Sequence, residues 1–133
     1  MSERILFVAA LHHPAALQDA IARTPPGEPP PLFPPSVLQH FWERALRRRG
    51  YTLDIFYRNL PPGGMIRAQH HRAGFTPQKA LTALLARIPP QTNPEYRRRN
   101  RALLEQALAF RPDVLWLVGD NSVIYPQTLA AIR

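Results

Sequence analysis

The sequence predicts an α/β fold in which helices flank a parallel β-sheet. Residues 5–10 (ILFVAA) form an apolar run without alternation, which is typical of a strand that is buried on both faces. Strand-like and helix-like segments then alternate along the chain, as they do in layered α/β domains. The 133 residues, 45% of them apolar, suit one domain or part of a larger one.

The first half of the chain predicts one helix on each side of a proline-rich segment. A short helix is expected over residues 15–23. Residues 24–35 (TPPGEPPPLFPP) are predicted to form an extended loop over the surface. Ser36 is predicted to cap a second helix that runs to about Arg49, with Gly50 as its stop. The residues expected on the apolar side of this helix are Leu38, Phe41, Trp42, Ala45 and Leu46.

The second half repeats the alternation. A strand is expected over residues 51–57 (YTLDIFY) and another over residues 114–118 (VLWLV). Proline at the first turn opens three helices, at Thr76-Pro77, at Asn93-Pro94 and at Pro126. The side chains expected to be buried on the helix that follows Asn93 are Leu103, Leu104, Ala107 and Leu108.

Composition narrows the classes of function. There is no cysteine, which excludes disulfides and thiol chemistry. No apolar stretch is long enough to span a bilayer, and we expect a cytoplasmic protein. The net charge is +8, and Lys79 is the one lysine among 17 Lys and Arg residues. This charge favours anionic partners such as a membrane surface, although runs of arginine are commonly solvated helix faces.

Candidate site residues follow the predicted strands. Ligands of open α/β sheets bind outside the carboxyl ends of the strands, so the residues after each strand are the candidates. His12 and His13 follow the first strand, and one imidazole could act as a general base. The candidates for binding substrate are Asn59 after the second strand and Gly119, Asp120 and Asn121 after the third. Alternatively, these are ordinary loop and turn residues.

Several well-known motifs are missing. The sequence has no GxGxxG fingerprint after its first strand, no GxxxxGK[ST] loop and no GxSxG elbow. His70 and His71 lack a third ligand at a spacing typical of metal sites, so we expect no bound metal. The arginines at positions 97–99 and 101 lie among few aromatic residues, so specific nucleic-acid binding is not expected.

Three segments together resemble a known family. They are RILFVAA near the start, WERALRRRGYTLDIF, and the long stretch NRALLEQALAFRPDVLWLVGDNSVIYPQTLAAIR. This pattern resembles the amino-terminal half of GT-B glycosyltransferases, particularly those of the CgeB-type spore-maturation group. The shared residues are Arg111-Pro112-Asp113, Gly119, Ile124, Pro126 and Thr128-Leu129.

The resemblance implies a Rossmann-like, acceptor-side domain over residues 1–133, truncated before a second domain that would hold the nucleotide-sugar donor. It implies no tightly bound cofactor and an unknown acceptor, with His12, His13, Asp120 and Asn121 lining the cleft. Such a fragment is expected to be inactive alone. The sequence departs from the family where LHHPA replaces the usual glycine-rich turn after the first strand.

Two other classes of function stay open. The chain could be a stand-alone Rossmann-like ligand-binding module, although a receiver-type domain would need an acidic cluster after the first strand, where LHHPA has none. It could also be a basic adaptor that binds an anionic membrane surface through its arginine clusters, in which case binding falls steeply with salt.

Overall fold

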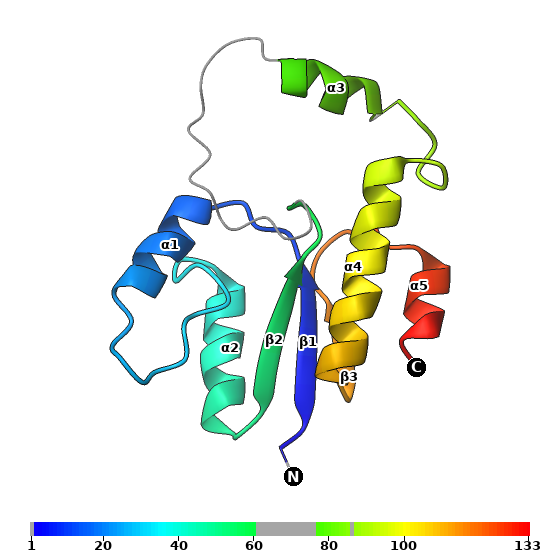
Figure 1. Ribbon diagram of the computed structural model, residues 1–133. Coiled ribbons are helices and arrows are strands. Elements are labelled where there is room, and N and C mark those ends of the chain that lie inside the picture. The colour runs from blue at the N-terminus through cyan, green and yellow to red at the C-terminus, as the bar shows by residue number, and fades with distance from the viewer. Residues whose placement is uncertain (1, 61–76, 86) are drawn as a thin grey trace.

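A computed structural model describes residues 2–60, 77–85 and 87–133 of the chain (Figure 1). The described residues form a three-stranded sheet from β1 (Arg4–Ala9), β2 (Thr52–Tyr57) and β3 (Val114–Leu117) in the order β2-β1-β3. All pairings are parallel, and Phe7 of β1 lies beside Ile55 on one side and Trp116 on the other. The predicted α/β fold with a parallel, Rossmann-like sheet is therefore confirmed.

Helices lie on both sides of this sheet. In Figure 1, α1 and α2 lie on one side of the strands, α4 and α5 lie on the other, and α3 lies apart from the sheet. A proline at the first position fixes φ and needs no amide partner, which explains why four of these helices begin at proline. The helices are α1 (Pro14–Ala22), α2 (Leu38–Arg48), α3 (Pro77–Leu85), α4 (Pro94–Phe110) and α5 (Pro126–Ala131).

The central strand β1 is buried on both faces, as its apolar run predicted. Leu6 and Val8 face α4 and pack in one cluster with Leu103 and Ala107. The alternate residues of β1 face the α2 side, where the ring of Phe7 meets that of Phe33 edge-on at 5.2 Å between centroids. The sheet thus separates two apolar cores.

Helix α4 agrees with most of its prediction. The side-chain oxygen of Asn93 accepts a hydrogen bond of 3.0 Å from the amide of Glu95, so Asn93 caps the helix. Leu103 and Ala107 are buried as expected. The prediction was wrong for Leu108, which is 61% exposed because it lies on the side of α4 that faces solvent.

Helix α2 departs further from its prediction. It begins at Leu38 after Val37, and no side chain caps it, so the cap assigned to Ser36 was wrong. Leu38 and Phe41 are 60% and 57% exposed, whereas the buried residue of α2 is Glu43. The expected apolar side is therefore split. Trp42 stacks on Trp116 at 5.5 Å between ring centroids and Leu46 packs against the core, as expected, whereas Ala45 is exposed like Leu38 and Phe41.

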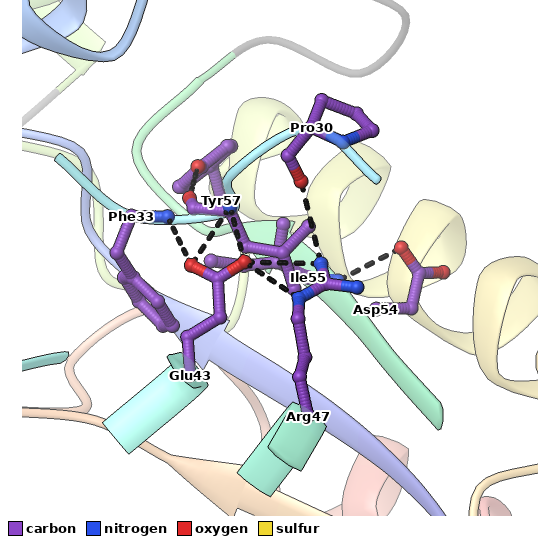
Figure 2. Close-up of polar contacts among 8 residues, drawn as sticks. Pro30, Phe33, Glu43, Arg47, Asp54, Ile55 and Tyr57 are labelled. Atoms are coloured by element: carbon purple, nitrogen blue, oxygen red, sulfur yellow. Dashed lines mark hydrogen bonds and ion pairs between the residues drawn. The ribbon is translucent and has the colours of Figure 1, made fainter. Parts of the chain in front are cut away.

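Glu43 can be buried because it lies in a polar network (Figure 2). Its carboxylate accepts hydrogen bonds from the amide of Leu32 at 2.9 Å and from that of Phe33 at 3.2 Å. The guanidinium of Arg47 pairs with it at 3.0 Å and also donates to the carbonyl of Pro30 at 3.3 Å. The proline-rich segment has neither helix nor strand, as predicted, and this Glu43 network holds its end against α2.

Tyr57 at the end of β2 adjoins the same network. Its hydroxyl donates a hydrogen bond to the carbonyl of Leu32 (Figure 2). Burial, and secondarily the negative charge of Glu43, raise the pKa of the Tyr57 hydroxyl well above its usual value. The phenol is therefore held in its protonated, donating form.

Candidate ligand site at the carboxyl edge of the sheet

The structure brings the candidate segments to one edge of the sheet. The strands are parallel, so the residues that follow them emerge at the same end. Because β1 lies between β2 and β3, the loop that contains His12 and His13 lies between the other two loops. The amide of Arg58 donates to the carbonyl of Ala9 at 2.9 Å, and that of Val118 donates to the carbonyl of Val8 at 2.8 Å. Backbone contacts therefore extend the sheet up to the candidate residues.

Asn59 joins two of these loops. Its side-chain oxygen accepts from the amide of Leu11 at 2.9 Å, and its side-chain nitrogen donates to the carbonyl of Leu11 at 2.8 Å. Both ends of the amide are thus used by the neighbouring loop. This geometry makes Asn59 a residue that positions the backbone just before His12. One N–H and one lone pair of its exposed amide remain for a ligand.

The two histidines are exposed and unrestrained by the described residues. Neither imidazole forms a hydrogen bond within that part of the chain, and the backbone carbonyl of His13 accepts from the amide of Leu17 at 3.2 Å. The rings can therefore meet a ligand. A general base is usually oriented by a third group, and no described residue orients these rings.

Arg58 crosses the edge from β2 towards β3. Its guanidinium donates to the carbonyl of Val118 at 2.7 Å, and its own carbonyl accepts from the guanidinium of Arg99 at 3.1 Å. The Arg99 side chain is 16% exposed and also pairs with Glu95 at 3.5 Å. Arg58 thus places a positive charge at the edge where ligands of such folds bind. Arg58 lies with Asn59 in the segment directly after the second predicted strand, and that position in the sequence marks it as a candidate.

In the corner after β3, Gly119 and Asn121 shape the turn, whereas Asp120 has an exposed side chain. Gly119 has φ +82°, a conformation that favours glycine, and a Cβ built there would lie 3.5 Å from a terminal nitrogen of Arg58. The side-chain oxygen of Asn121 accepts from the amide of Ile124 at 3.0 Å, which closes a turn. Asp120 is exposed and makes no hydrogen bond to a described residue. Of the three predicted binding residues here, Asp120 has the side chain that is most available to a ligand.

A second polar network fixes the chain beyond this corner. Asn100 of α4 is 4% exposed. Its side-chain nitrogen donates to the carbonyls of Tyr96 at 2.7 Å and Val123 at 2.9 Å. Its side-chain oxygen accepts from the amide of Tyr125 at 2.7 Å and from the hydroxyl of Thr128 at 2.8 Å. This Asn100 network joins α4, the loop after β3 and α5.

Two kinds of feature are absent from the described residues, a metal-type cluster of side chains and a helix suited to crossing a membrane. No group of three His, Asp or Glu side chains lies close enough to hold a metal ion within residues 2–60, 77–85 and 87–133. His70 and His71 lie outside the described residues. None of the described helices has the length and apolar character needed to cross a bilayer.

Comparison with known proteins adds no relative. The chain matches no family model, no curated protein and no solved structure. The strands themselves define the class of fold, which is an α/β domain with a parallel sheet. The resemblance to GT-B glycosyltransferases stays a prediction.

Proposed function

We propose that this chain is the acceptor-side portion of a glycosyltransferase of the GT-B type, which transfers a sugar from a nucleotide-sugar donor to an unknown acceptor. The observation that supports this most is the convergence of three loops, each after a parallel strand, on one edge of the sheet. In the proposal a second domain binds most of the donor, so residues 1–133 alone are inactive.

The side chains at this edge have separate proposed roles. His12 or His13 accepts a proton from the acceptor hydroxyl as its oxygen bonds to the anomeric carbon of the sugar. The bond from that carbon to the phosphate oxygen of the donor breaks, and the nucleotide leaves. Asp120 hydrogen-bonds to an acceptor hydroxyl. Asn59 and Asn121 hold the loops that present these groups. Gly119 adopts the φ of +82° that the corner after β3 requires.

The test is a sugar-transfer assay on the native protein purified from its source, with a panel of nucleotide-sugar donors. We expect release of nucleotide by the native protein and none by residues 1–133. Substitution of both His12 and His13 by Ala should lower kcat about 100-fold, the usual contribution of a positioned base. Exposed Gln91→Ala is the control and should leave the rate unchanged.

Two results would contradict the proposal. Turnover by residues 1–133 alone would show that no second domain is needed. A native protein that neither transfers sugar nor hydrolyses any donor would favour the ligand-binding module instead.

A basic adaptor is the second candidate, favoured by the surface of α4. Arg97 and Arg98 are exposed and unpaired among the described residues, while Arg101 pairs with Glu105 in a solvent-exposed ion pair at 3.4 Å. This candidate predicts co-sedimentation with vesicles rich in anionic lipid. Binding should fall steeply with salt and after substitution of both Arg97 and Arg98 by Gln.

A further inference from the structure

A pocket of about 390 Å³ lies away from the carboxyl edge, between the end of α1, the proline-rich segment and α2. Its volume is within the range of small-molecule sites, roughly 300–1,000 Å³, and exceeds what a single ion requires. Helix α1, which separates it from His13, is about 13 Å long at 1.5 Å per residue. The pocket is therefore distinct from the proposed acceptor site. The ionisable side chains that line it are Arg23, Glu28, His40, Glu43, Arg44 and Arg47.

The charges in this lining do not balance. Glu43 and Arg47 form an ion pair, and the Glu43 carboxylate also accepts from the amides of Leu32 and Phe33. Arg23 and Arg44 have no polar partner among the described residues. Glu28 is the carboxylate left to oppose them. An excess of positive charge therefore remains in the pocket, and it suits an anionic ligand.

His40 adds a directed hydrogen-bond donor. Its Nδ1 is sealed from solvent and has no hydrogen-bond partner in the described part of the chain. A proton on Nδ1 would be a buried donor without an acceptor, so the tautomer with its proton on Nε2 is favoured. Because His40 lines the pocket and its Nδ1 is sealed, Nε2–H is the donor that remains for a ligand there.

The wall of the pocket that the proline-rich segment forms is stiff. Pro25, Pro29 and Pro31 line the pocket, and proline has a fixed φ. The Glu43 network holds this segment through Pro30, Leu32 and Phe33. A ligand that enters therefore meets a wall that is already ordered, which reduces the entropy lost on binding.

We propose that this pocket binds a small organic anion whose phosphate or carboxylate group is held by Arg23, Arg44 and the Nε2–H of His40. The proline rings contact the apolar part of the same molecule. Both kinds of oxyanion accept charge-assisted hydrogen bonds from guanidinium groups, so the two are separated by experiment.

The test is a titration of the ¹⁵N-labelled protein, followed by NMR, with three probes: inorganic phosphate, glycerol 3-phosphate and succinate. Sodium chloride keeps the ionic strength constant. We expect saturable shifts of the amides of Arg23, Thr24, Gly27 and Glu28 and of residues 40–47 for a phosphate probe, for succinate, or for both. The probe that saturates identifies the oxyanion. The His40 ring nitrogens should report a proton on Nε2 and a change in Nε2–H on binding.

Matched variants distinguish binding at a defined site from nonspecific attraction of anions by the net positive charge. Arg44→Ala should weaken binding of the saturating probe about tenfold, because one charge-assisted hydrogen bond is lost. Arg48→Ala removes the same charge from an exposed position of α2 outside the pocket and should change the affinity less than twofold. Glu28→Gln should tighten binding several-fold, since it removes the opposing charge.

Three results would overturn the proposal. The first is that no probe gives saturable shifts. The second is that Arg44→Ala and Arg48→Ala weaken binding equally, which would show that the net charge attracts anions without a site. The third is a Glu28→Gln variant that binds the probe more weakly. Circular dichroism of each variant should match that of the unaltered protein, because Arg44, Arg48 and Glu28 are exposed.

Discussion

Glu43 and Asn100 are both buried polar residues on helices that face the sheet, but they hold their neighbours by different chemistry. The Glu43 carboxylate only accepts hydrogen bonds, and its charge is matched by Arg47. The Asn100 amide is neutral, and it both donates and accepts. A charged acceptor can hold a segment that offers only backbone amides, whereas an amide can hold a segment that offers both kinds of group.

The largest effect is expected for the charged network. Glu43→Ala leaves the amides of Leu32 and Phe33 without an acceptor, and we expect it to lower the free energy of unfolding by about 3 kcal/mol. Urea unfolding measures this. Glu105→Ala is the control, since it removes a carboxylate from a solvent-exposed pair and should cost about 0.5 kcal/mol or less. Equal losses for the two variants would show that burial of Glu43 does not matter.

A smaller loss is expected for the neutral network. Asn100→Ala should lower the free energy of unfolding by about 2 kcal/mol, because several hydrogen bonds are lost but no charge is left unpaired. Hydrogen exchange should accelerate at the amide of Tyr125, which loses its acceptor. If Asn100→Ala costs more than Glu43→Ala, the charge of Glu43 is not what makes its network strong.

The two networks should also differ in their response to alkali. The folded-state pKa of Tyr57 is raised above its unfolded value. The contribution of its protonated hydroxyl to the free energy of unfolding is therefore complete below a pH of about 10 and is lost as the pH rises. The slope from this one group approaches about 1.4 kcal/mol per pH unit at most. Urea unfolding of Tyr57→Phe should lack this slope, whereas Asn100→Ala should keep it. An unchanged slope in Tyr57→Phe would assign it to other groups.

The smallest effect tests one contact of the neutral network. Thr128→Val removes the hydroxyl that donates to the Asn100 oxygen, and we expect a loss of about 1 kcal/mol in the free energy of unfolding. In the Asn100→Ala background the same substitution should cost little, because its partner is gone. Equal costs in both backgrounds would show that Thr128 acts independently of Asn100.

The contrast between these networks shows what sequence patterns can predict. Apolar runs predicted the strands, and the prolines at positions 77, 94 and 126 predicted where three helices begin. The cap by Asn93 was also predictable, because both partners lie within one turn. These features depend on residues that are close together in the chain.

Features that depend on distant partners were missed. Glu43 was not among the residues expected to be buried on α2, because its acceptor role depends on amides of an aperiodic segment. The spacing of Glu43 and Arg47, four positions apart, was the one local sign. The exposure of Leu38 and Phe41 was also missed, because the apolar pattern of α2 does not show which of its apolar residues meet the sheet.

The candidate site was predictable in location but not in the partners of its residues. The rule for parallel sheets placed the loops after β1, β2 and β3 at one edge, and the structure has them there. The rule could not show that the side chain of Asn59 is hydrogen-bonded to the backbone of Leu11, or that the guanidinium of Arg58 donates to the carbonyl of Val118. Those contacts join residues 48 and 60 positions apart.

The central position of β1 also has a consequence during synthesis on the ribosome. β1 is the first of the three strands to be made, yet its contact with the start of β3 joins Arg4 to Asp113, which are 109 positions apart. At about 5–20 residues per second, roughly 5 to 20 seconds separate the two. During that interval β1 can pair with β2 alone, and a two-stranded sheet is marginal in water. The most deeply buried of the three strands is thus the one that has its full set of partners only after β3 has been made.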